Sequence, residues 1–350
     1  MVANRRGVLA VALASTVLGL TTSAAALPGD GSADGGAAAG RKVCPAAQAK
    51  VERLEGRVTP NVCAFLQRQI RFGEMPTGPA PEPGESGFEH PRVKAYLDIF
   101  DTDATLWEAG SKARRGRDEI GPSIINSLGL VKDLRYRGTD VVAEGSTVVF
   151  GQWNEATVKG HKIAFPQIAR NVLGDDGKSL QARRYYDRHV LLRDTLPDAP
   201  SGLFEGIADS GPAPAKTPAS RGRADAELPR RLAAWNSEDI DTLLARTGNM
   251  RLSGPGLDAP LSTAAAKKSY LQRFFDKANV ELKAGQVAVG KTTTYVEWHG
   301  TVTRPQGEPV PFGIMERFGP GGEWELYFDT LPLLADQKTI DDLFAKLARS

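Results

Sequence analysis

The stretch that decides the fold is YLDIFDTDATLWEAG at residues 96–110, which is followed by GRDEI at residues 116–120. Apolar residues recur at helical spacing over residues 91–100 and again over residues 116–128, so both stretches are predicted to be helices. Between them, ATLWE at residues 104–108 predicts a short strand. The order helix, strand, helix is typical of the start of an α+β unit.

Four further strands are predicted to complete this unit. They cover residues 140–144, 147–158, 161–173 and 180–192, and GDDG at residues 174–177 provides a turn between the last two. A sheet of this kind needs helices to cover one of its faces. We therefore expect helices packed on one face of a bent antiparallel sheet.

The second half of the chain repeats this order of elements. Helices are predicted at residues 228–244 and 264–275, and strands at residues 250–252, 286–289, 292–302, 310–318 and 324–330. Trp153 and Trp298 occupy matching places in the two halves, as do Arg170 and Arg317. We predict two tandem copies of one α+β unit, which pair with each other within the chain.

Composition gives the expected boundaries of these units. The first residues contain two arginines, an apolar run and a small-residue ending, the order of a cleavable signal peptide. An uncleaved anchoring helix is the alternative. The predicted parts are a signal peptide at 1–26, a disordered leader at 27–42, a helical segment with a Pro/Gly linker at 43–87, the first unit at 88–196, a Pro/Gly-rich linker at 197–223 and the second unit at 224–350.

The chain is expected to be secreted, and no later segment is apolar enough to cross a membrane. At its end, Ile340, Leu343, Phe344 and Leu347 fall on one face of a predicted helix over residues 337–349. We expect this helix to pack on the second unit.

The sequence contains two cysteines, Cys44 and Cys63. In an oxidising compartment a pair at this spacing can close a loop, and we predict a disulfide between them. Two free, buried thiols are the alternative. The two cysteines have no histidine near them, and the four histidines of the chain lie in different predicted elements, so no metal site is expected.

Charge and motifs argue against several classes of function. The formal net charge is +2, with 44 basic and 42 acidic residues, which does not favour nucleic acid as a partner. The sequence has no nucleophile elbow, phosphate loop or dinucleotide-binding fingerprint. We therefore expect no cofactor.

The motifs at residues 96–110 and 116–120, with YYD at residues 185–187 after a glycine turn, resemble the nuclear transport factor 2-like superfamily, and within it the SnoaL-like branch. The second unit matches more loosely, with YFD at residues 327–329. This resemblance implies two cone-shaped α+β barrels, each with a curved sheet around a mostly apolar pocket. Relatives include cofactor-free cyclases and isomerases as well as proteins that bind without catalysis.

The resemblance also implies a role for Asp187, because a closing-strand aspartate is the acid/base group of SnoaL-like cyclases. A carboxylate in an apolar pocket has its pKa raised by desolvation, which suits proton transfer. Tyr186 and His189 are the candidate partners, with His189 expected on the same strand face as Asp187. Asp329 stands at the matching place in the second unit. For both aspartates the alternative is a residue that ends a strand and caps the next turn.

The walls of the pockets are predicted to include Trp107, Trp153, Phe165, Trp298 and Asp329. Two functions follow from this reasoning. The first is binding of a small apolar ligand or a protein partner without catalysis. The alternative is a cofactor-free lyase, isomerase or cyclase in which Asp187 moves a proton beside a carbonyl. The sequence favours the first, because the acidic set is incomplete in the second unit.

Overall fold

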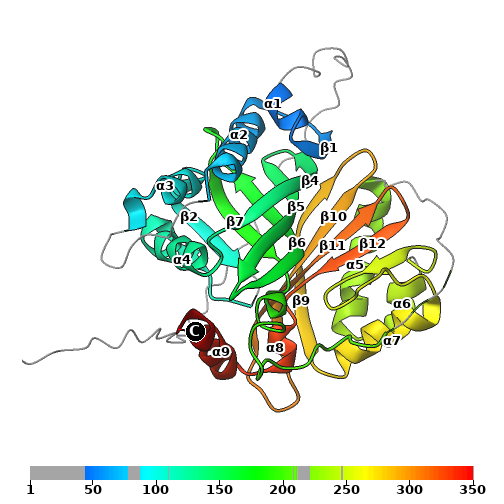
Figure 1. Cartoon of the computed structure of the whole chain (residues 1–350). Helices are drawn as coiled ribbons and strands as arrows, with labels where there is room; N and C mark the ends of the chain where they lie inside the picture. Colours follow the sequence, from blue (N-terminus) through cyan, green and yellow to red (C-terminus); the bar gives the residue numbers. More distant parts are fainter. Residues whose placement is uncertain are drawn as a thin grey trace, which may run out of the picture. The chain divides into compact units, whose positions relative to one another are not determined.

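Two sheets, each covered by helices on one face, make up the part of the chain that the structure describes (Figure 1). This computed structural model describes residues 44–77, 87–108, 110–207, 209, 211, 221–245 and 247–349. The predicted signal peptide and leader lie outside these residues. We call each sheet with its helices a lobe.

The first lobe contains a seven-stranded, mostly antiparallel sheet. Its order is β1 (Val51–Gly56), β4 (Arg135–Glu144), β5 (Thr147–Val158), β6 (His161–Leu173), β7 (Ser179–Tyr185), β2 (Phe100–Glu108) and β3 (Arg114–Arg115). The pairs β1–β4 and β2–β7 are parallel. The predicted ranges of β5 and β6 are confirmed. Two long strand patterns separated by the two-residue turn Lys159-Gly160 define a hairpin well.

Helices α2 (Pro60–Glu74), α3 (Pro91–Leu97) and α4 (Gly116–Leu130) cover one face of the first sheet. Their apolar side chains meet those of the strands in one buried cluster, in which Phe65, Tyr96, Phe100 and Phe150 are each less than 5% exposed. Phe72 of α2 packs edge-on against the ring of Tyr96 at 5.2 Å between centroids. In this lobe the space between helices and sheet is therefore filled by side chains.

The segment before α2 is only in part helical, although the sequence predicted a helical segment from residue 43. After the single turn α1 (Pro45–Gln48), residues Val51–Gly56 form a strand, β1, at the edge of the first sheet. The spacing of Val51 and Leu54 indicated a helix. Residues 51–56 are instead extended, because they pair with β4. Glu55 of β1 also accepts a hydrogen bond from the main-chain nitrogen of Thr292 in the second lobe, at 2.8 Å.

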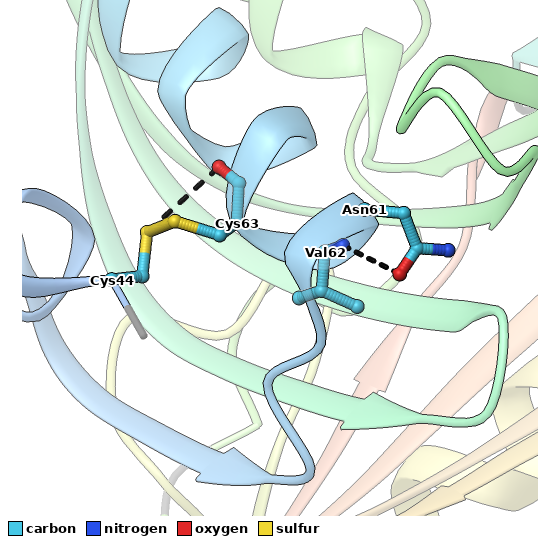
Figure 2. Close-up of a disulfide and its surroundings, with 4 residues drawn as sticks. All are labelled: Cys44, Asn61, Val62 and Cys63. Atoms are coloured by element: carbon cyan, nitrogen blue, oxygen red, sulfur yellow. Dashed lines mark hydrogen bonds between the residues drawn. A yellow bond between two sulfur atoms is a disulfide. The ribbon is translucent and has the colours of Figure 1, made fainter. Parts of the chain in front are cut away.

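The predicted disulfide between Cys44 and Cys63 is confirmed, and it joins the start of α1 to the first turn of α2 (Figure 2). Both cysteines are buried. At the beginning of α2, the main-chain nitrogen of Val62 donates to the side-chain oxygen of Asn61 at 3.0 Å. The covalent loop therefore contains β1 and fixes it beside the helix.

The second lobe has a five-stranded sheet. Its order is β8 (Arg251–Ser253), β12 (Glu323–Tyr327), β11 (Val310–Gly319), β10 (Thr294–Thr303) and β9 (Asn279–Val289). Helices α5 (Arg221–Asn236), α6 (Ile240–Ala245) and α7 (Ala264–Phe275) cover one face. The predicted range of α7 is confirmed, and the long helix predicted before it consists of two helices, α5 and α6. Together, the two helix-covered sheets confirm the predicted α+β class with two tandem copies.

Aromatic side chains fill the space between helices and sheet in the second lobe as well. Trp235, Phe274, Trp298 and Phe328 are all buried there. Glu316 accepts hydrogen bonds from Arg231 at 2.8 Å and from the ring nitrogen of Trp235 at 3.2 Å. This interior is packed, with a buried ion pair among its rings.

The two lobes meet through the sheet faces that the helices leave uncovered. Side chains of the first sheet contact those of the second in a buried apolar cluster of Val142, Val149, Ile168, Tyr185, Ala288, Tyr295 and Met315. Strands β4 and β5 lie against β9, and β7 lies against β11. The two copies therefore pair within the chain, sheet against sheet.

The last strand of the first unit and the C-terminal helix both differ from expectation. Strand β7 ends at Tyr185 instead of Leu192, and a short helix η3 (Arg188–Leu191) follows it. Helix α9 (Gln337–Arg349) has the predicted range, but after the short α8 (Leu331–Leu334) it packs largely on the first lobe. Its buried residues meet Val158, Phe165 and Leu192 there. The prediction that it packs on the second unit was wrong, because an amphipathic pattern does not identify the surface that covers it.

None of the described helices has the length and apolar character needed to cross a membrane.

Replacing both cysteines by alanine is expected to lower the free energy of unfolding by about 3 kcal/mol, because the open chain gains loop entropy when it unfolds. Urea unfolding of the native protein and the Cys44→Ala/Cys63→Ala variant measures the difference. Equal midpoints and slopes for the two proteins would contradict this role of the covalent loop.

Candidate functional site

A cleft of about 620 Å³ lies between the lobes. The first lobe contributes residues of β5 and β6 and the segment after β7, and the second contributes β12 and the loop that follows β8. Five residues that the sequence predicted for a site line it: Trp153, Phe165, Tyr186, Asp187 and His189. The volume is within the usual range for small-molecule sites.

Aromatic and apolar side chains form one part of the lining. Trp153 on β5 is partly exposed, and its cross-strand partner on β6 is Pro166. The rings of Phe165 and Tyr186 stack at 5.6 Å between centroids. Burial raises the pKa of the Tyr186 phenol, and the Glu108 carboxylate adds to the effect, so this hydroxyl stays protonated at neutral pH.

A charged cluster forms another part of the lining. Arg317 on β11 donates to Asp140 of the first lobe at 2.7 Å, to Glu323 at 3.0 Å and to Glu325 at 2.8 Å. Arg53 of β1 donates to the second oxygen of Asp140 at 2.8 Å. Two guanidinium groups thus face three carboxylates, which leaves one excess negative charge.

Asp187 lines the cleft, but it also joins the lobes. Its Oδ1 accepts from the main-chain nitrogen of Thr330 at 3.0 Å, from the Thr330 hydroxyl at 2.8 Å and from the main-chain nitrogen of His189 at 3.1 Å. The aspartate therefore caps η3 and binds the start of α8 at the same time. These contacts agree with the alternative interpretation of Asp187 as a capping residue, and two of them cross the interface between the lobes.

Asp329 makes the reciprocal contacts from the second lobe. Its Oδ1 accepts from the main-chain nitrogen of Arg188 at 3.1 Å, and its Oδ2 accepts from the Arg188 guanidinium at 2.8 Å. Burial raises the pKa of Asp329 to about 6, although Arg188 opposes this shift, and the nearby Asp187 carboxylate raises it further. Asp329 is fully buried and does not line the cleft.

His189 is placed by η3 and not by a strand. Its Nε2 lies 2.7 Å from the main-chain oxygen of Pro200. Because a carbonyl oxygen can only accept, Nε2 must carry the hydrogen. The prediction that Asp187 and His189 share a strand face was therefore wrong, since the strand ends before both, although both line the cleft.

Besides Asp329, two predicted wall residues lie elsewhere. Trp107 packs against Tyr185 at the interface of the two sheets, with ring centroids 5.5 Å apart. Trp298 is fully buried in the interior of the second lobe. Neither residue lines the cleft.

A third ion pair joins the lobes in the fully buried part of the interface. Arg170 on β6 donates to Glu297 on β10 at 3.0 Å, and both side chains are 1% exposed. Tyr185 donates to the same carboxylate at 2.5 Å, and Arg183 lies 3.5 Å from it. Burial alone raises the pKa of Glu297, but these partners outweigh it and hold the pKa below the ordinary value.

Sequence reasoning missed the charged part of the cleft. No sequence motif contains Arg53, Asp140, Glu323 or Glu325. The sequence alone also did not show how their strands pair. Arg317 could have been predicted as a site residue. It matches Arg170 in the repeat, so both copies have an arginine at this position of an inner strand.

None of the family models compared with the sequence matches it, and no curated protein matches it. Solved structures are similar to part of the chain. A candidate SnoaL-like polyketide cyclase from Jannaschia sp. has 12% identity and a TM-score of 0.30, with 37% of this chain and 90% of that chain covered. A nuclear transport factor 2-like protein of unknown function from Burkholderia pseudomallei has 12% identity and a TM-score of 0.30, with 37% and 95% covered. A candidate polyketide cyclase from Bacillus cereus has 14% identity and a TM-score of 0.32, with 41% and 89% covered.

Replacing Arg170 by methionine is expected to lower the free energy of unfolding by about 3–5 kcal/mol, because Glu297 would lose its closest guanidinium while remaining buried. Denaturant unfolding measures the loss. Lys338→Met is the matched control, since it breaks an exposed pair with Asp342 and should cost less than about 1 kcal/mol. Similar losses for both variants would contradict the buried pair as a main support of the interface.

The contribution of Glu297 should depend on pH. Its pKa is lowered in the folded protein from the ordinary value of 4.5, so its stabilising effect is fully present above that pH and is lost as pH falls through the folded value. The difference in unfolding free energy between native protein and Glu297→Gln should therefore shrink on acidification below about 4.5. A difference that stays constant or grows down to the acid transition would contradict this account.

Proposed function

We propose that this chain is an exported protein that binds a small molecule in the cleft between its two lobes, without catalysing a reaction. Buried side chains pack between the helices and the sheet in both lobes, and this favours the cleft over the lobe interiors as the ligand site. Trp153 and Phe165 supply aromatic surface, and the charged cluster at Arg317 supplies polar groups. A few polar groups in a largely apolar cleft are typical of ligand sites.

The observation that carries the non-catalytic assignment is the set of bonds at Asp187. Three donors occupy Oδ1, and two of them come from Thr330 in the other half of the chain. A general base must accept a proton from the substrate, and Oδ1 is engaged in holding the lobes together, so only Oδ2 is left for that task. These hydrogen bonds account for the position of Asp187 without a catalytic role.

Export is supported by two features. The first residues have the order of a signal peptide, and the Cys44–Cys63 disulfide is of a kind that persists in oxidising compartments. A secreted protein meets small molecules that its cell does not make, so a binding role fits this location.

The second candidate function is a cofactor-free lyase, isomerase or cyclase. It is favoured by the fact that Tyr186, Asp187 and His189 all line the same cleft. In that case Asp187 would abstract a proton next to a carbonyl, and the Tyr186 phenol would donate to the resulting enolate oxygen.

The variant Asp187→Asn separates the two functions, because it removes the proton-accepting carboxylate but leaves an amide oxygen, with two lone pairs, to accept hydrogen bonds from Thr330 and His189. We expect thermal stability close to that of the native protein, and ligand affinity within about threefold, or roughly 0.7 kcal/mol. The measurement is a thermal-shift screen of apolar carbonyl compounds, followed by calorimetry on the compounds that bind.

Trp153→Ala is the companion variant and should weaken binding at least tenfold, since it removes a wall of the cleft. Turnover of a bound compound by the native protein, abolished in Asp187→Asn, would overturn the binding assignment in favour of the enzyme. Binding that is unchanged in Trp153→Ala would show that the ligand occupies another site.

A further inference from the structure

We propose that the ligand carries a neutral amide group, either a primary carboxamide or a lactam, which binds the paired side chains of Gln152 and Gln167 in the cleft. This inference rests on the proposed function and specifies the chemical class of its ligand. The ligand oxygen would accept from the amide nitrogen of one glutamine, and the ligand N–H would donate to the amide oxygen of the other.

The first observation is that the two glutamines form a pair in the lining. Gln152 on β5 and Gln167 on β6 are direct cross-strand partners, and both line the cleft. Residues opposite each other in an antiparallel pair project to the same face of the sheet. The Nε2 of Gln167 donates to the Oε1 of Gln152 at 2.8 Å. This bond holds the two amide groups side by side.

The second observation is that the pair keeps one free donor group and one free acceptor. The Nε2 of Gln152 and the Oε1 of Gln167 form no hydrogen bond with any described residue. Exchanging oxygen and nitrogen in both side chains gives the same result, with a free donor on one glutamine and a free acceptor on the other. The pair therefore presents a donor beside an acceptor in either orientation.

The burial of the pair shows what a ligand would gain. Each glutamine is only 8% exposed. The two free atoms still contact solvent, because neither is among the fully enclosed polar atoms that lack a partner in the described ranges. A ligand that displaces water from both atoms must replace both hydrogen bonds, since an unpaired polar group is costly in such a site.

These two atoms select a neutral amide among the common polar groups. A carboxylate has no donor for the free glutamine oxygen, and an ammonium group has no acceptor for the free glutamine nitrogen. A ketone provides an acceptor alone. A primary carboxamide or a lactam provides an acceptor and a donor on the same side, so it can satisfy both glutamines at once.

An aromatic surface lies on the same face of the sheet as the pair. Phe165 precedes Gln167 by two residues on β6, so both side chains project to one face. The ring of Tyr186 stacks on Phe165, and both residues line the cleft. An aryl amide would place its ring towards Phe165 and Tyr186 while its amide group reaches the glutamines. Such a ligand is well within a volume of about 620 Å³.

The experiment compares three ligands of one shape: benzamide, acetophenone and benzoate. Dissociation constants are measured by calorimetry at pH 7 and constant ionic strength. We expect the native protein to bind benzamide about tenfold or more tightly than acetophenone, in which a methyl group replaces the amide nitrogen. Benzoate, which lacks a donor, should also bind about tenfold or more weakly than benzamide.

The shape of the amide provides a second test on the native protein. The lactam 3,4-dihydroisoquinolin-1-one holds its N–H and C=O on one side, whereas the trans amide of N-methylbenzamide points them in opposite directions. The lactam should bind about tenfold or more tightly than N-methylbenzamide. Equal affinities for these two compounds would contradict simultaneous binding to both glutamines.

The variant Gln152→Met/Gln167→Met tests the assignment to this pair. It replaces both side chains by apolar ones of similar size, so neither glutamine is left without its partner. This variant should bind benzamide and acetophenone with similar affinity. Gln67→Met is the matched control, because Gln67 is exposed on α2 and lies outside the cleft, and it should keep the native preference. A preference for benzamide that survives in the double variant would overturn the assignment.

The outcomes separate this inference from the proposed function. Equal affinity of the native protein for benzamide and acetophenone would overturn the amide class. The binding function would then stand if a compound from the thermal-shift screen loses affinity in Trp153→Ala. Failure of every compound to bind would overturn both. Tighter binding of a blocked glutamine dipeptide than of benzamide would overturn the small-molecule source and assign the amide to a protein side chain.

Discussion

The structure depends on a reciprocal contact in which an aspartate from each lobe accepts a hydrogen bond from the main chain of the other. Asp187 binds the nitrogen of Thr330, and Asp329 binds the nitrogen of Arg188. Each aspartate also accepts from the nitrogen two residues further along its own chain segment. These bonds fix the ends of β7 and β12 relative to each other, and the cleft lies beside this junction.

The two copies differ in the contacts that they make at the interface between the lobes. Arg170 and Arg317 occupy matching places, yet their acidic partners lie on non-equivalent strands. Glu297 on β10 binds Arg170 in a dry interface, whereas Asp140 on β4 binds Arg317 at the edge of a cavity. A buried pair with full hydrogen bonding is rigid, while a partly exposed cluster presents charged groups to the cleft. The first arginine therefore supports the interface, and the second supports the proposed binding site.

Local patterns in the sequence predicted local structure well. The ranges of β5, β6, α7 and α9, the disulfide and the repeat of the α+β unit follow from periodicity, turns and spacing. The strand β1 could not be predicted, because its conformation is set by pairing with β4, more than 80 residues away. The packing of α9 on the first lobe and the end of β7 before Asp187 also depend on contacts between the two halves. For the same reason the family resemblance directed attention to two cone interiors, whereas the candidate site lies between the copies.

A crystal structure of the protein with a compound from the thermal-shift screen bound to it tests the central claim most directly. The account predicts electron density for the ligand between the lobes, in contact with Trp153. Density for the ligand among the side chains that surround Tyr96 or Phe274, inside either lobe, would contradict it.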